Sequence, residues 1–156
     1  MIAIRPYCES DAGALAKVFE RAVRGDAARD YAPAQIEAWI GREPKAGRFR
    51  AKMADGRRCW VATDGEGQVR AFVDLEADGH IDFLFADPAV AGTGVASQLL
   101  DVLEAAARRD GIARLYVEAS EAARRFFLKR GYEVLRRRDF EIDGVAIHNY
   151  AMERRP

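Results

Sequence analysis

Cysteine is scarce in this 156-residue chain, long hydrophobic runs are absent, and neither sign of charge is in excess. Cys8 and Cys59 are two lone residues far apart, which fits neither a disulfide framework nor a four-ligand zinc site, so a reducing compartment is expected. No apolar run approaches the roughly 18 residues of a membrane span, and Arg5 and Pro6 interrupt the apolar start too early for a signal peptide. We therefore expect a cytoplasmic protein without a metal or a membrane partner.

The charge balance argues against a general attraction to polyanions. Lys and Arg together count 25, as do Asp and Glu, so the formal net charge is zero. Binding to nucleic acid along a broad surface needs a basic surplus, and no such partner is expected. The charges are nevertheless uneven, because residues 1–107 carry 13 basic and 17 acidic side chains and residues 108–156 carry 12 and 8. The C-terminal third is the part better suited to an anionic ligand.

The hydrophobic content of 49% excludes a disordered chain, and the length predicts a single domain spanning residues 1–156. Residues 2–5 alternate as a strand, and apolar residues at helical spacing predict helices after Ser10-Asp11 and from Pro33. Residues 41–58 show no clear pattern. Strands at 60–62, 69–76 and 80–86 are separated by tight turns, which predicts an antiparallel meander.

The second half of the chain predicts a crossover followed by a hairpin. A periodic helix ends at Asp110-Gly111, and the strand at 113–117 must return parallel to strand 80–86 because a helix connects them. A shorter helix ends at Gly131. Asp143-Gly144 then joins two strands in a hairpin. The chain therefore belongs to the α/β proteins with a mixed, mostly antiparallel sheet.

A glycine loop, Ala91-Gly92-Thr93-Gly94, opens the periodic helix. The free N–H groups and the positive end of a helix dipole suit phosphate oxygens, and glycine allows a close approach to the main chain. The loop lacks the Gly-Lys-Ser/Thr of a P-loop, and Ser97 occupies the third glycine position of a dinucleotide fingerprint. Glu118 after the next strand keeps a nucleotide-dependent oxidoreductase as a weaker alternative, which the antiparallel strands disfavour.

Two motifs resemble the signatures of the GCN5-related N-acetyltransferase (GNAT) family. Leu84-Phe85-Ala86-Asp87-Pro88, Ala91 to Ala96 and Leu99-Leu100 resemble its apolar triplet, its Gln/Arg-x-x-Gly-x-Gly/Ala loop and its Leu-rich helix. Ser120 to Tyr132 resembles its Asn-x-x-Ala-x-x-Leu/Phe-Tyr-x-x-x-Gly-Phe motif. The resemblance covers essentially the whole chain, and residues 31–39 with Phe126-Phe127 look like a small uncharacterised bacterial branch. It implies a twisted sheet with helices on both faces.

The resemblance also implies an activity and a binding site. It implies that acetyl-CoA is the co-substrate and that its acetyl group moves to a primary amine of a small molecule or peptide, by direct attack in a ternary complex. The protein would act as a monomer or homodimer. The pyrophosphate would lie on the glycine loop and the pantetheine arm on the strand edge before it. The residues expected to bind acetyl-CoA are Leu84, Phe85, Ala86, Gly92, Thr93, Gly94, Val95, Ala96, Ser97, Ser120 and Phe127.

Three positions depart from the family pattern. Ala91 replaces Gln or Arg, Ser120 replaces Asn, and Phe127 stands where the family usually has a tyrosine that protonates the departing thiolate. A phenyl ring cannot donate a proton, so water, another hydroxyl or the product ammonium must take that role. The departures leave open an alternative, an acyl-CoA-binding module without transferase activity.

Acyl transfer to an amine needs the amine in its neutral form, because an ammonium has no lone pair. By alternation along strand 80–86, His80 and Asp82 face the same side as Leu84 and Ala86, which makes them the candidate general bases. An unpaired carboxylate within an apolar strand is costly and so suggests a function. Tyr31 and Trp39 lie where the family fold covers the acceptor site, and we expect them there.

Overall fold

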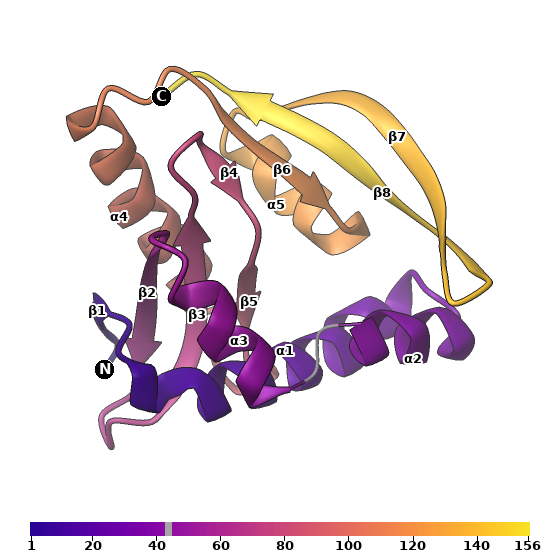
Figure 1. The fold of residues 1–156 in the computed structure, drawn as a ribbon, viewed down its shortest axis with the longest axis horizontal. Coiled ribbons are helices and arrows are strands. Elements are labelled where there is room, and N and C mark those ends of the chain that lie inside the picture. Colours follow the sequence, from indigo (N-terminus) through magenta and orange to yellow (C-terminus); the bar gives the residue numbers. More distant parts are fainter. Residues whose placement is uncertain (43–44) are drawn as a thin grey trace.

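The computed structural model describes residues 1–42 and 45–156. Within these ranges, no helix combines the length and the hydropathy needed to cross a membrane. Figure 1 shows the strands as one twisted, forked layer with helices on both sides. The elements are β1 (Ala3–Pro6), α1 (Ala12–Asp26), α2 (Pro33–Arg42), α3 (Ala46–Met53), β2 (Arg58–Thr63), β3 (Val69–Leu75), β4 (His80–Ile81), β5 (Leu84–Ala86), α4 (Val95–Arg109), β6 (Leu115–Ala119), α5 (Glu121–Lys129), β7 (Glu133–Ile142) and β8 (Val145–Arg154).

The strands form two groups that meet at one end. The first has the order β1-β2-β3-β5 and the second the order β4-β6-β8-β7. The β4–β6 pair is parallel, as the crossover through α4 predicts, and the other pairs are antiparallel. The N–H of Glu76, just after β3, donates to the carbonyl of His80 at 2.9 Å, so β3 lies beside β4 as well as β5. The expected mixed, mostly antiparallel sheet is confirmed.

Alternation along β2 and β3 divides the interior into two cores. Val61 and Phe72 point into an aromatic-rich core with α1, α2 and α3. Their neighbours Ala62 and Ala71 point to the other face, where Leu99 and Leu103 of α4 are fully buried. Removing these apolar faces from water stabilises the fold at roughly 25 cal/mol per Å² buried. Helices therefore cover both faces of the sheet, as the resemblance implied.

The strand predicted at 80–86 is interrupted, and a buried carboxylate explains the break. Oδ1 of Asp74, on β3, accepts hydrogen bonds from the N–H groups of Asp82 at 3.0 Å and Phe83 at 2.7 Å. These amides are therefore satisfied by a side chain instead of a neighbouring strand. Burial raises the pKa of Asp74 to about 7, while the Phe83 amide and Arg57, at 2.6 Å from Oδ2, favour its ionised form.

This break corrects one sequence prediction, and a second segment contains a helix that its sequence does not predict. Residues 80–86 form β4 and β5 in different strand groups, so the alternation that placed His80 and Asp82 on one side with Leu84 does not carry across it. Residues 41–58, whose sequence shows no clear pattern, include α3, and Phe49 of this short helix is buried in the aromatic core. The final hairpin lies where Asp143-Gly144 predicts it, and its tip is tied to α2 by Gln35, whose Nε2 donates to the Ala146 carbonyl at 3.0 Å.

Candidate active site

Beyond the break, β5 diverges from β6 and leaves a main-chain edge open. Strand β5 pairs with β3 alone in the described part of the chain. The bonds from Asp74 N to Phe83 O and from Asp87 N to Arg70 O flank the Phe72–Phe85 pair, which makes Phe85 the residue bonded to β3. The polar groups of Leu84 and Ala86 therefore face the open edge, where an extended ligand can pair with them.

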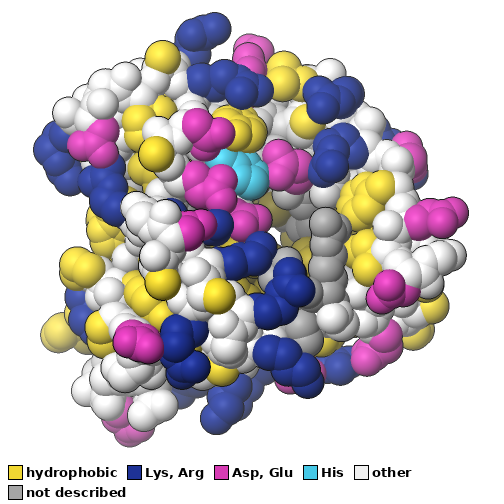
Figure 2. All heavy atoms as spheres, viewed as in Figure 1, with side chains coloured by type: hydrophobic (Ala, Val, Ile, Leu, Met, Phe, Trp, Pro, Cys, Tyr) yellow, Lys and Arg dark blue, Asp and Glu magenta, His cyan; other side chains and the backbone are white. Residues whose placement is uncertain are grey.

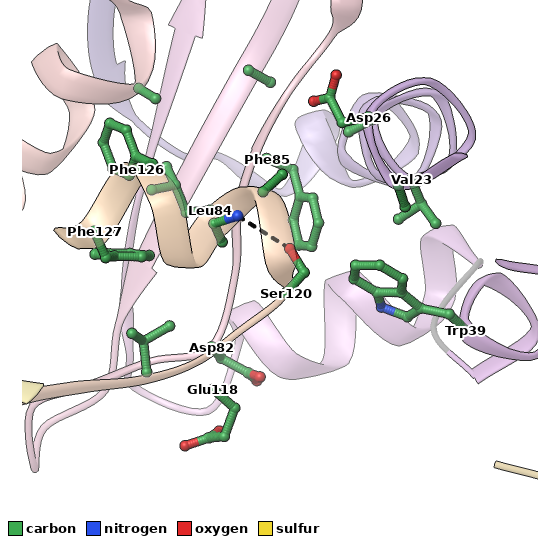
Figure 3. Close-up of a pocket in the computed structure, with 17 residues that line it drawn as sticks. Val23, Asp26, Trp39, Asp82, Leu84, Phe85, Glu118, Ser120, Phe126 and Phe127 are labelled. Carbon is green, nitrogen blue, oxygen red and sulfur yellow. Dashed lines mark hydrogen bonds between the residues drawn. The ribbon is translucent and has the colours of Figure 1, made fainter. Parts of the chain in front are cut away.

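A first pocket, which we call the fork pocket, fills the space between β5 and β6 (Figure 3). Apolar side chains dominate it, and Leu84, Phe85 and Phe126 are among those that line it (Figure 3). The first turn of α4 contributes Ala96 to the lining of this pocket. The lining consists of Ala22, Val23, Asp26, Ala27, Trp39, Asp82, Leu84, Phe85, Ala86, Ala96, Val117, Glu118, Ser120, Ala122, Ala123, Phe126 and Phe127.

The glycine loop leads from β5 to the start of α4. Gly92 and Gly94 have φ values of +76° and +80°, a region that residues with a Cβ rarely adopt. Gly94 is the residue before the first turn of α4 and provides no side chain to cap it. The first N–H groups of the helix, from Val95 to Ser97, thus lack a side-chain acceptor and lie at the positive end of the helix dipole.

A second pocket, the hairpin pocket, lies between α2 and the β7–β8 hairpin and meets the fork pocket at the divergence of the strands. Both pockets are lined by Trp39, Asp82, Phe85, Glu118 and Ser120. The remaining lining of the hairpin pocket is Phe19, Tyr31, Lys52, Phe83, Arg138, Phe140, Ile142, Ile147, His148 and Asn149.

Trp39 and Tyr31, the residues expected near an acceptor, both line the hairpin pocket. Their ring centroids are 5.8 Å apart in an edge-on arrangement. The Tyr31 hydroxyl donates to the His148 carbonyl at 3.0 Å and accepts from the Glu121 N–H at 3.2 Å. Burial raises the pKa of Tyr31 to about 12, so it remains a neutral phenol and fastens α2 to the hairpin.

His80 lies between two carboxylates beside the junction of the pockets. Its Nδ1 is 2.9 Å from Glu76 Oε2 and its Nε2 is 2.7 Å from Glu118 Oε1. Burial lowers the pKa of His80, but the bonds to Glu118 and Glu76 outweigh it and raise the pKa to about 9. Figure 2 shows acidic side chains gathered around a histidine on this face. At neutral pH His80 is thus an imidazolium with both nitrogens engaged, an arrangement that favours orienting Glu118 over accepting a proton.

Asp82 faces both pockets and also belongs to an ion-pair network. Its Oδ2 is 2.9 Å from Nη1 of Arg57 and 3.5 Å from Nζ of Lys52. Arg57 is almost fully buried and also bonds Asp74 and Glu76. The carboxylate is therefore held in place at the junction, with its charge partly balanced by two cations.

Comparison with known proteins decides the family. Residues 27–154 match the model of the acetyltransferase (GNAT) domain. This chain belongs to the GNAT family. It is 33% identical over 155 residues to the uncharacterized N-acetyltransferase YafP of Escherichia coli K12, covering 99% of this chain and 97% of that protein. It is also 25% identical over 152 residues to the uncharacterized N-acetyltransferase Rv2669 of Mycobacterium tuberculosis H37Rv, covering 93% and 97%.

Solved GNAT structures share the fold. A crystal structure of a GCN5-related N-acetyltransferase from Rhodopseudomonas palustris matches with a TM-score of 0.91 and 34% identity, covering 99% of this chain and 95% of that chain. The PaiA N-acetyltransferase of Thermoplasma acidophilum, solved in complex with coenzyme A, matches with a TM-score of 0.77 and 17% identity, covering 100% and 99%. The resemblance and the fold expected from the motifs are both confirmed.

The structure shows what surrounds two of the residues that depart from the GNAT motifs, Ser120 and Phe127. Ser120 Oγ caps α5 by accepting from the Ala123 N–H at 3.3 Å, which leaves its own proton free to donate at the junction (Figure 3). Phe127 is fully buried against Tyr132, with ring centroids 4.8 Å apart. It lines the fork pocket with a phenyl ring, which has no polar atom. Ser120 is the hydroxyl that faces both pockets.

Several residues of the site are not predicted from the sequence. In the sequence, Glu118 stands out only as an acidic residue after a strand, and a carboxylate within Leu115-Tyr-Val-Glu-Ala, on the strand parallel to β4, is the signal that points to it. Lys52 lies in the segment without a pattern. Arg138 belongs to a run of three arginines, and nothing in the sequence separates it from Arg136 and Arg137.

Proposed function

We propose that this GNAT protein transfers an acetyl group from acetyl-CoA to a primary amine while both substrates are bound. The observation that supports this most is the meeting of two pockets at one set of side chains, Asp82, Glu118 and Ser120. One pocket is apolar and adjoins a phosphate-type loop, and the other is rich in charged and polar groups. Two different substrates can therefore approach each other at the junction.

Acetyl-CoA suits the fork pocket. The N–H groups from Gly92 to Ser97 would hold the pyrophosphate. The pantetheine arm would pair with the main chain of Leu84 and Ala86, as an added strand pairs with a free edge. The N–H of Leu84 faces the same edge and would polarise the thioester carbonyl. The coenzyme A bound to PaiA, a protein of the same fold, supports this choice of co-substrate.

The amine must lose a proton before it attacks. An alkylamine with a pKa of about 10.4 is neutral in only about one molecule in 2,500 at pH 7. Asp82 and Glu118 both face the two pockets, but Asp82 is paired with Arg57 whereas Glu118 bonds His80 through Oε1, so Glu118 would accept this proton, directly or through one water. His80 would orient Glu118, and Asp82 would attract the ammonium form.

The nitrogen then bonds to the acetyl carbon, and the C–S bond breaks with its electron pair on sulfur. The nitrogen's remaining excess proton leaves to solvent, and the departing thiolate takes the proton held by Glu118, or one from water, to become the CoA thiol. Ser120, with a free hydroxyl proton at the junction, would hydrogen-bond that sulfur. Among the described residues, no cysteine lines either pocket, which favours direct transfer over a cysteine thioester intermediate.

The test is calorimetric titration of the protein with acetyl-CoA and with CoA, followed by a thiol-release assay over a panel of amines. We expect saturable binding that Gly94→Asp weakens at least about 100-fold, because a side chain is strained at φ +80° and a carboxylate repels the phosphates. Gly65→Asp is the matched control, since Gly65 lies in an exposed turn with ordinary φ and free space around it. Absence of binding overturns the proposal. Binding without turnover of any amine supports the acyl-CoA-binding module instead.

A further inference from the structure

The hairpin pocket contains an arginine, Arg138, whose side chain contacts an amide and an aromatic ring. Arg138 on β7 is partly buried, its Nη1 donates to Asn149 Oδ1 at 3.0 Å, and its guanidinium lies 5.4 Å from the centre of the Phe140 ring. Among the described residues, it forms no ion pair with a carboxylate. A guanidinium fixed by a neutral amide and an aromatic ring keeps donors available for an anion.

Arg138 faces the same space as the catalytic junction. Across the strands, Arg138 pairs with Asn149, and Glu118 pairs with Ala151, which is two residues from Asn149 on β8. Paired residues and residues two apart share one face of a sheet, so Arg138, Asn149 and Glu118 project from the same face. Two strand spacings of about 4.8 Å and a two-residue step place the Cα atoms of Glu118 and Arg138 about 12 Å apart.

The two ends of the pocket therefore have opposite electrostatic character. At the junction, Asp82 and Glu118 belong to a cluster with Asp55, Asp74 and Glu76, in which five carboxylates face three cations, Arg57, Lys52 and protonated His80. Lys52 is engaged there, with Nζ 3.5 Å from Asp82 and 5.1 Å from the centre of the Phe83 ring. At the far end, the guanidinium of Arg138 faces an amide.

From this arrangement we propose that the acceptor is a small amino carboxylate. Its ammonium lies at Asp82 and Glu118, and its carboxylate bonds the guanidinium of Arg138. The inference rests on the proposed acetyl transfer and specifies its substrate class. Trp39, Phe140 and Ile147 line the same pocket and provide apolar walls, which suit a body of several carbon atoms. Arg138 is then a specificity-determining residue that takes no part in bond making.

Matched amines test the proposal. Acetylation is measured with 4-(aminomethyl)benzoate against 4-methylbenzylamine, and with 6-aminohexanoate against hexylamine. The wild type should prefer each carboxylate in kcat/KM by about 10- to 100-fold, the range for an ionic hydrogen bond. Arg138→Gln should remove that preference while leaving the plain amines within about twofold. The control Arg137→Gln, on the opposite face of β7 and paired with Asp139, should change neither.

The outcomes separate this inference from the proposed function. A wild type that does not prefer the carboxylates, or an Arg138→Gln variant that loses activity equally on both members of a pair, overturns the inference and leaves the transfer reaction standing. If none of the four amines is acetylated, calorimetric titration of the two amino carboxylates into CoA-saturated protein decides. Binding that Arg138→Gln weakens supports the assignment, and binding that is absent or unchanged contradicts it.

Discussion

The two pockets of the site are built in different ways. The fork pocket comes from a contiguous part of the chain, from β5 through the glycine loop and α4 to β6 and α5, with one wall from α1 and α2. The hairpin pocket draws side chains from α1, α2, α3, β6, β7 and β8, which are far apart in the sequence. The first uses main-chain groups and apolar surface, whereas the second uses charges. A pocket that binds a common co-substrate can reside in local motifs, whereas one that selects an acceptor is assembled by the fold.

The largest effect is expected at the junction that the two pockets share. Glu118→Gln keeps the size of the side chain and removes its basicity, so kcat should fall by about 100- to 10,000-fold. Affinity for CoA should change little, because we propose that CoA binds the fork pocket mainly through main-chain groups. The measurements are thiol-release kinetics and CoA titration of the same preparation.

Glu76→Gln is the matched control for this variant. Glu76 bonds the other nitrogen of His80 and lines neither pocket. We expect its kcat to stay within about tenfold of the wild type. Equal losses in the two variants would contradict a direct role for Glu118 and assign the effect to His80.

The next largest effect is expected on the stability of the fold at Asp74, beside the point where β5 diverges from β6. Asp74→Ala leaves two amides without their acceptor and removes one of the carboxylates that pair with the buried Arg57, so the free energy of unfolding should fall by about 3–5 kcal/mol. Asp64→Ala is the control, because Asp64 also accepts from two amides and an arginine, but in a surface turn. It should cost about 1 kcal/mol. Urea unfolding measures both, and equal losses would show that Asp74 does not anchor the fork.

The smallest effect is a pH dependence that comes from His80. Its pKa is raised to about 9 in the folded protein from an ordinary value of 6.5, so the stability it contributes is fully present below about pH 6.5 and is lost as the pH rises through 9. The free energy of unfolding of the wild type should exceed that of His80→Gln by roughly 2–3 kcal/mol at low pH, with the gap closing over that window. A gap that does not vary with pH would show that His80 is not held as a cation.

The sequence predicted the fork pocket better than the hairpin pocket for a physical reason. The glycines at 92 and 94 indicate a loop with positive φ values. The parallel pairing of β6 with β4 follows from the single crossover helix between them. Both features can be predicted from local sequence patterns. The interruption before β5 depends on Asp74, whose carboxylate accepts hydrogen bonds from amides eight and nine residues further along the chain. In the sequence, Asp74 looks like an ordinary strand residue. Arg138 acquires its position only through strand pairing, which local patterns do not encode.

We propose that both pockets are filled at once and that the acetyl group passes directly between them. Initial-velocity kinetics with acetyl-CoA and an amine that is turned over, each varied at several fixed concentrations of the other, test this most directly. Simultaneous binding predicts double-reciprocal lines that intersect, with no CoA released until the amine is added. Parallel lines, with a burst of CoA thiol in the absence of an amine, would mean that the acetyl group first resides on the protein and would contradict the account.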